Sequence, residues 1–271
     1  AVASIAFALF ATGLWSACLF RAVAGFGLAG TYMPGLRLLS DRLEGPAQSR
    51  AVAFYTASFS VGVSLSVLLA GAMNEAIGWR AAFGLAGACA AAALVIATVS
   101  LGRAGSAPPP VSSSVSVLDF RPVLANRKAL RYSLGYAAHM WELFGLRAWI
   151  VAFLVFAINR TDDELPAGVS ATDAAALILV LALPASLLGN EASLRFGRRR
   201  TLLAVMSLSA VLAGLVGLSA ALPPIAMLAV LAVYGAVVGA DSASLTAGAV
   251  AAARPGQQGL TMSFHTLIGF A

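Results

Sequence analysis

The feature that most constrains this chain is a succession of apolar runs, most of them about 20 residues long. The runs lie at 1–11, 14–38, 51–73, 81–101, 131–157, 172–189, 201–221, 224–251 and 258–271. An α-helix rises about 1.5 Å per residue, so about 20 residues cross the ~30 Å hydrocarbon core of a bilayer. The runs are continuous and rich in Ala, Leu and Gly, without the alternation of a membrane barrel strand. The sequence therefore predicts an all-α, polytopic transmembrane helical bundle with seven complete spans and two partial ones.

The composition supports this fold class and excludes several others. Charged residues make up 10% of the 271 residues and hydrophobic residues 60%, whereas a soluble domain carries roughly 25% charged residues. The net charge of +6 comes from arginines at the ends of the apolar runs. These form no continuous basic face with interleaved aromatics, so we expect no nucleic-acid partner. Cys18 and Cys89 both lie in apolar runs, which excludes a secreted disulfide scaffold.

Basic residues fall mainly on one side of the predicted topology when the connections alternate between the two sides. One set of connections comprises 41–50, 102–131, 190–200 and 252–257. The other set comprises 12–13, 74–80, 158–171 and 222–223. The first set carries twelve of the 17 basic residues, and the second carries only Arg80 and Arg160. By the positive-inside rule the first set is cytoplasmic, and we predict a multi-pass protein of the cell membrane, either an inner or a plasma membrane.

The longest connection, 102–130, contains Gly-Ser-Ala-Pro-Pro-Pro followed by a Ser/Val-rich run. Consecutive prolines cannot continue a helix, so we predict a cytoplasmic linker between two helical bundles, 1–101 and 131–271. The chain opens with Ala1 inside one apolar run and closes inside another. We therefore expect a piece of a longer polytopic chain.

Three short patterns follow one another along the sequence. They are Arg21-Ala-Val-Ala-Gly25-Phe-Gly27, Gly78-Trp79-Arg80-Ala-Ala-Phe83 and Arg195-Phe-Gly197-Arg198-Arg199-Arg200. In this order, and with the long central connection, they resemble the major facilitator superfamily of secondary transporters. The resemblance covers essentially the whole chain and implies a twelve-helix, two-bundle fold, truncated here at both ends. The bundle 1–101 would hold the end of helix 3 to helix 6, and 131–271 would hold helix 7 to the start of helix 11.

The third pattern resembles the cytoplasmic loop motif of that family between helices 8 and 9. Its matching residues are Arg195, Gly197, Arg198 and Arg199. The family's form, Gly-x-x-x-Asp-Arg-x-Gly, is incomplete here, because Asn190 occupies the first glycine position and Leu194 the acidic one. We therefore expect the basic cluster to cap helix ends and contact anionic headgroups rather than to relay charge.

Ionisable groups inside apolar spans are costly and mark candidate functional sites. Glu142 is the strongest candidate, because it lies near the middle of the run 131–157 with His139 three residues earlier on the same helical face. Desolvation favours the neutral form of a carboxyl group, and histidine titrates near neutral pH, so the two residues could load and release a proton. A static bridge that locks helices together is the alternative role for Glu142.

Other polar and aromatic residues complete the predicted cavity. They are Arg21, Asp241, Arg147, Trp141 and Tyr55. The resemblance implies that Arg21, in the family's helix-4 motif, takes part in proton coupling; a structural hydrogen bond is the alternative. Asp241 follows Gly235-x-x-x-Gly239, a signature of close helix packing, and could face the cavity or bond to its small neighbours. For His265, in the last run, we predict a packing role.

These observations predict a secondary active transporter that moves a small solute by alternating access and is driven by protons. Its expected partners are the lipid bilayer, protons and a small-molecule substrate, anionic or zwitterionic because of the intramembrane arginines. We expect no cofactor and no metal, since no Cys/His cluster occurs. Two other classes stay open: a membrane-embedded enzyme that uses His139 and Glu142 as acid–base residues, and a non-transporting sensor with the transporter fold.

Overall fold

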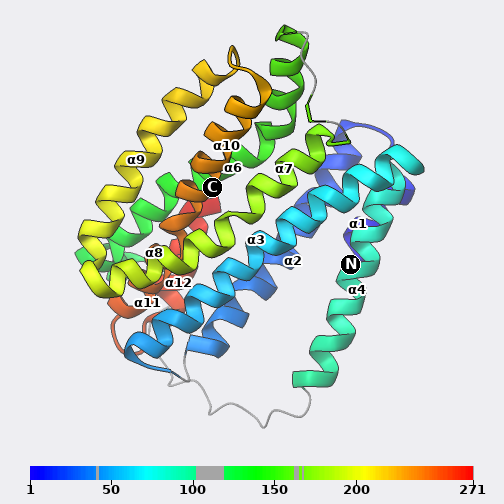
Figure 1. The fold of residues 1–271 in the computed structure, drawn as a ribbon. Coiled ribbons are helices and arrows are strands. Elements are labelled where there is room, and N and C mark those ends of the chain that lie inside the picture. Colours follow the sequence, from blue (N-terminus) through cyan, green and yellow to red (C-terminus); the bar gives the residue numbers. More distant parts are fainter. Residues whose placement is uncertain (41–42, 102–118, 162–164, 167, 271) are drawn as a thin grey trace. The chain divides into compact units, whose positions relative to one another are not determined.

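The computed structural model of the protein describes residues 1–40, 43–101, 119–161, 165–166 and 168–270. The helices are α1 (Val2–Phe10), α2 (Leu14–Ser40), α3 (Gly45–Ala76), α4 (Trp79–Leu101), α5 (Arg121–Leu124), α6 (Arg127–Thr161), α7 (Ala171–Val180), α8 (Ala182–Phe196), α9 (Arg198–Ser219), α10 (Pro224–Ala240), α11 (Ser242–Ala252) and α12 (Gln258–Phe270). The described residues form helices and connecting turns without a strand (Figure 1). This confirms the all-α fold class.

Seven stretches of the described residues are long and apolar enough to cross a membrane. They are Leu14–Leu39, Gly45–Ala76, Trp79–Ser100, Arg127–Thr161, Ala171–Phe196, Arg198–Ser219 and Pro224–Ala252. Each corresponds to one predicted complete span. Large apolar side chains such as Trp15 and Leu218 are exposed, while polar ones such as Ser133 and Asn190 are buried. This distribution suits a protein solvated by lipid, in which polar groups must find partners inside the protein.

The turn predicted at Thr12–Gly13 lies between α1 and α2. The backbone N–H groups of Thr12 and Gly13 each donate to Oγ of Ser16 at 3.1 Å. The Ser16 hydroxyl in turn donates to the Gly13 carbonyl at 2.9 Å. These bonds satisfy amides that the start of a helix leaves without partners. The prediction that 1–38 cannot be one helix is therefore confirmed.

Two of the spans are interrupted, which the apolar runs did not predict. The span Ala171–Phe196 breaks at Leu181 between α7 and α8. Pro184 explains this break, because proline has no N–H to donate to the carbonyl four residues earlier and its ring crowds that carbonyl. The span Pro224–Ala252 breaks at Asp241, which ends α10 and begins α11. A break inside a span exposes backbone polar groups, and transporters place such breaks at binding sites.

By their contacts the residues fall into two compact units, which we describe separately. The first unit comprises Ala1–Pro34 and Ser66–Ser112, and the second comprises Gly35–Leu65 and Ser113–Ala271. The predicted division into bundles on either side of 102–130 stays a prediction. Residues 102–118 of the predicted linker lie outside the described residues.

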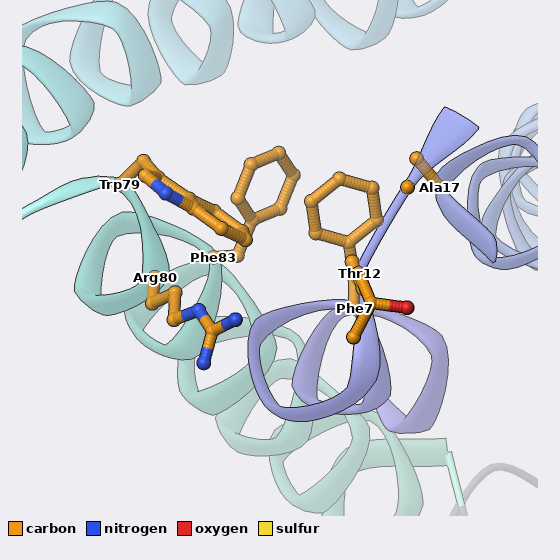
Figure 2. Close-up of a pocket in the computed structure, with 8 residues that line it drawn as sticks. Phe7, Thr12, Ala17, Trp79, Arg80 and Phe83 are labelled. Atoms are coloured by element: carbon orange, nitrogen blue, oxygen red, sulfur yellow. The ribbon is translucent and has the colours of Figure 1, made fainter.

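In the first unit α1 packs along α4. The rings of Phe7 and Phe83 stack with their centroids 4.0 Å apart, and the Trp79 ring stands nearly perpendicular to both (Figure 2). Such offset and edge-on arrangements are the favoured ones for aromatic rings. The aromatic contact fixes α1 against the first turn of α4.

In the second unit α6 contacts α11 and α12, while α10 contacts α8 and α9. The Gly235-x-x-x-Gly239 signature acts as predicted in this packing. A Cβ atom at Gly239 would lie 2.5 Å from Cβ of Ala182, and one at Gly235 would lie 2.8 Å from Cγ2 of Ile178. Small residues thus bring α10 against α7 and α8.

The same packing predicts a large cost for a methyl group at Gly189 of α8. A Cβ atom there would overlap the Ala240 carbonyl of α10, whereas one at Gly214 of α9 would meet nothing within 4 Å. We expect Gly189→Ala to lower the stability by about 1–3 kcal/mol, the usual cost of overpacking. Gly214→Ala serves as the matched control and should not lower it. Thermal denaturation of the two detergent-solubilised variants measures the difference, and equal midpoints would contradict the close approach.

Candidate functional site

A buried ion pair joins α6 to the break between α10 and α11. Nδ1 of His139 lies 2.8 Å from Oδ1 of Asp241, and the two side chains are 0% and 5% exposed. The contact has the distance of an ion pair without the angle of a hydrogen bond. The attraction is therefore electrostatic and depends on protonation of the imidazole. Two titratable groups thus meet inside a span, at a point where the helix is already interrupted.

His265 extends this cluster from α12. Its side chain is fully buried, and its ring stacks on the ring of Tyr136 with centroids 3.9 Å apart. Nδ1 of His265 lies 3.3 Å from Oγ of Ser133. The Tyr136 ring also lies near His139, since the centroids of these two stacked rings are 6.1 Å apart. The packing role predicted for His265 is present, but its partners place it beside the ion pair, which the sequence alone did not indicate.

Glu142 has partners of its own on two other helices. The Ser209 hydroxyl of α9 donates to Oε1 of Glu142 at 2.6 Å. Tyr234 of α10 is close enough to the same carboxyl group to interact with it electrostatically. His139 and Glu142 make no contact with each other among the hydrogen bonds and ion pairs of the described chain. The two residues are therefore placed in separate polar contacts rather than as one pair.

The remaining predicted cavity residues have varied surroundings. The Arg147 guanidinium lies 5.2 Å from the ring centroid of Phe59 on α3. Tyr55, also on α3, lies against Gly35, where a Cβ atom would come within 2.5 Å of the tyrosine hydroxyl oxygen. Trp141 is 79% exposed on α6, so its ring does not contribute to the buried cluster. In the first unit, Arg21 lies 5.9 Å from the ring centroid of Phe83.

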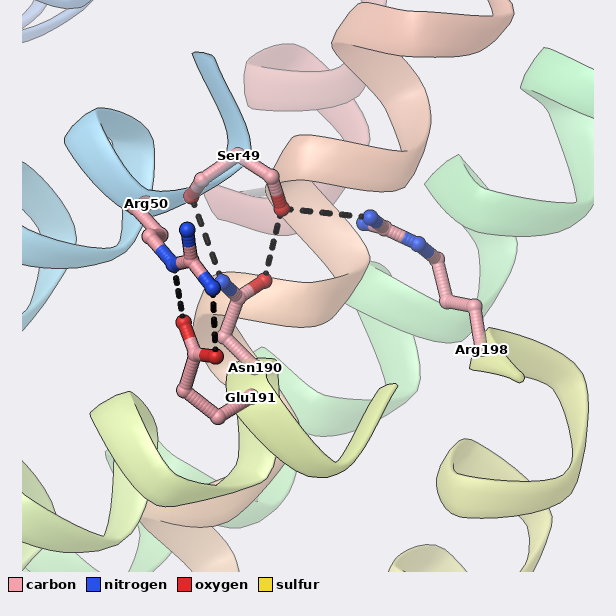
Figure 3. A network of polar contacts seen from close by, with 5 residues as sticks. All are labelled: Ser49, Arg50, Asn190, Glu191 and Arg198. Atoms are coloured by element: carbon pink, nitrogen blue, oxygen red, sulfur yellow. Dashed lines mark hydrogen bonds and ion pairs between the residues drawn. The ribbon is translucent and has the colours of Figure 1, made fainter. Parts of the chain in front are cut away.

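A second polar network joins the start of α3 to the end of α8 (Figure 3). The Ser49 hydroxyl donates to Oδ1 of Asn190 at 2.9 Å, and both residues are buried. Beside them, Arg50 donates to both carboxylate oxygens of Glu191 at 2.6 and 3.0 Å. The ion pair is half exposed, at 55% and 47%. Sequence reasoning missed this network, because its two halves are 141 positions apart.

The predicted loop motif takes part in this network through one residue. Arg198 donates to the Ser244 carbonyl at 2.7 Å and to Oγ of Ser49 at 3.2 Å. The Arg198 guanidinium is therefore held between helices, and the headgroup contact expected of the basic cluster stays a prediction. Arg199 is exposed, and the Arg195 guanidinium lies 5.3 Å from the Phe196 ring centroid. Gly197 joins α8 to α9 at a positive φ of 91°, a conformation that favours glycine.

Neither polar cluster is arranged to hold a metal. Within the described ranges, no group of three His, Cys, Asp or Glu side chains is placed to bind a metal ion. What the clusters can do chemically is bind and release protons, and make or break contacts between helices.

Comparison with known proteins identifies the family. The sequence matches the profile of the Major Facilitator Superfamily over residues 1–271. No curated protein matches the chain. The family match covers the whole chain and agrees with its seven apolar spans. The family is one of transporters. This chain therefore belongs to the Major Facilitator Superfamily and is a multi-pass membrane transporter.

Proposed function

We propose that this transporter is proton-coupled and works by alternating access, with the His139–Asp241 pair as its proton site. The observation that carries the proposal is the contact between Nδ1 of His139 and Oδ1 of Asp241, buried inside a span and at a break in that span. Ionisable groups at such a depth are expensive and are typical of proton pathways. A pair of His and Asp can exist with or without one extra proton, and each state changes the attraction between α6 and the α10–α11 break.

Glu142 acts as a second carboxyl group in this proposal. It accepts a hydrogen bond from Ser209, so α6 is tied to α9 at this position. A change in the charge of Glu142 alters the strength of this bond, because charge-assisted hydrogen bonds are roughly twice as strong as neutral ones. The predicted substrate, anionic or zwitterionic, would meet the Arg147 guanidinium, which lies on the same helix. Arg21 keeps the coupling role that the family motif implies.

The network around Ser49 and Asn190 supports the alternating-access part of the proposal. By the predicted topology it lies at the cytoplasmic ends of α3 and α8. The predicted bundle division assigns these helices to different halves of the transporter. Contacts of this kind hold one side closed, and they must break when the other side closes.

Proteoliposomes that contain a trapped pH-sensitive dye test the proposed function without knowledge of the substrate. A panel of small organic anions, zwitterions and cations is added outside, one compound at a time, with and without an imposed pH gradient. We expect at least one anion or zwitterion to change the internal pH only in vesicles that contain the protein. Uptake of a compound without any movement of protons would contradict proton coupling. Binding of a compound without uptake would favour a sensor and contradict transport.

A further inference from the structure

The first unit contains a pocket that the proposed transport mechanism does not use. It has a volume of about 630 Å³ and is lined by the end of α1, the turn to α2 and the start of α4. Three aromatic rings form its walls, those of Phe7, Trp79 and Phe83 (Figure 2). Arg80 supplies its charged side chain. An aromatic wall beside one cation is an amphipathic surface, apolar on one side and charged on the other.

The charges at this pocket are positive. The Arg80 guanidinium lies 5.1 Å from the ring centroid of Trp79, and within the described ranges no carboxylate comes within ion-pair distance of it. The pocket also lies at the first turn of α4, where a helix carries partial positive charge. Arginine binds phosphate groups well, because its planar guanidinium can donate two parallel hydrogen bonds.

The topology places this pocket at the membrane surface. The connections 12–13 and 74–80 are predicted to lie on the non-cytoplasmic side. Arg80 is one of only two basic residues in the connections on that side, the other being Arg160. Tryptophan and tyrosine collect at the level of lipid headgroups, and Trp79 lies next to the arginine in sequence and in space. An arginine on the side that the positive-inside rule depletes therefore calls for a local anionic partner.

We propose that this pocket binds the headgroup of an anionic phospholipid from the non-cytoplasmic leaflet. Arg80 binds the phosphate, and the rings of Phe7, Trp79 and Phe83 pack against the glycerol and the upper part of the acyl chains. A zwitterionic lipid carries its own cation beside the phosphate and gains less from the guanidinium. The site is independent of the proton site, since it belongs to the first unit and shares no residue with it.

Lipid retention tests this site. The full chain is reconstituted into vesicles of equal phosphatidylglycerol and phosphatidylcholine, extracted in mild detergent, purified, and analysed for bound lipid by mass spectrometry. We expect the wild-type protein to retain phosphatidylglycerol in preference to phosphatidylcholine. A basic residue near the membrane contributes about 1 kcal/mol toward an anionic lipid, so Arg80→Gln should lower this preference about fivefold. Arg80→Lys, which keeps the charge, should retain part of it.

Arg160→Gln is the matched control, because it removes the same charge from the same predicted side without touching the pocket. An equal loss in Arg160→Gln and Arg80→Gln would show general surface charge and overturn the proposal, as would wild-type protein with no preference. Inorganic phosphate distinguishes a lipid from a free anion. If inorganic phosphate displaces the bound phosphatidylglycerol at a concentration equal to that of the lipid, the pocket recognises phosphate alone and the lipid proposal is wrong. Equal thermal midpoints of the variants exclude misfolding, which is not expected for an exposed side chain.

Discussion

Asp241→Asn is expected to abolish proton-driven uptake and to leave substrate exchange at equal pH on both sides of the membrane intact. Asparagine matches the size of aspartate and cannot bind a proton, so His139 loses the charged partner that lies 2.8 Å from it. Without the carboxylate, protonation of the imidazole no longer creates an ion pair between α6 and the α10–α11 break. Exchange requires the substrate site and the movement of helices, and it does not require net transfer of a proton. Uptake into proteoliposomes under a pH gradient measures the first activity, and exchange of labelled for unlabelled substrate measures the second.

Glu142→Gln is the control for this prediction. This change also replaces a carboxyl group, on α6, by a neutral amide, but the Ser209 hydroxyl can still donate to the glutamine oxygen. We expect proton-driven uptake by Glu142→Gln to fall and to remain above that of protein-free vesicles. Undiminished gradient-driven uptake by Asp241→Asn would remove the ion pair from the proton site. Loss of exchange as well as uptake would indicate a folding defect, which the thermal midpoint would reveal.

The sequence predicted the spans well, because each span is a local property. About 20 apolar residues satisfy the bilayer wherever they occur, and the turn at Thr12–Gly13 followed from length alone. The Gly235–Gly239 contact was also local, since small residues four apart lie on one helix face. By contrast, the break at Asp241 could not be predicted from the apolar pattern, because the run 224–251 is continuous around it.

Partners of the polar residues could not be predicted, because partners depend on which helices become neighbours. His139 and Glu142 are three positions apart, about 60° around a helix of 3.6 residues per turn. Helix α6 is contacted by several other helices, and this small angle is enough for His139 to meet Asp241 while Glu142 meets Ser209. Ser49 and Asn190 are polar residues in different segments, and nothing in either segment indicates the other.

The second large effect is expected from substitutions in the network between α3 and α8. Loss of its buried neutral pair should cost more free energy than loss of its exposed ion pair. Asn190 is 0% exposed and bonds to Ser49, whose hydroxyl also accepts from Arg198. Removal of one partner leaves buried polar groups unsatisfied, at a cost of about 1–3 kcal/mol. The Arg50–Glu191 pair is half exposed, and exposed ion pairs contribute about 0.2–1 kcal/mol. Asn190→Ala should therefore weaken the α3–α8 contact more than Glu191→Gln does.

Labelling of a cysteine one helical turn from Ser49 measures this difference. Ala53 of α3, one helical turn after Ser49, is buried, so Ala53→Cys, in a background without Cys18 and Cys89, reacts with a maleimide only when the helices packed around this part of α3 separate. Since 1.4 kcal/mol corresponds to about tenfold in an equilibrium, we expect Asn190→Ala to speed labelling by about fivefold or more and Glu191→Gln by less than about fivefold. A larger effect of Glu191→Gln would mean that the charged pair, and not the buried one, holds the helices together. If neither variant changes labelling, the network does not close this side of the transporter, because helices held by it must separate more often once it is broken.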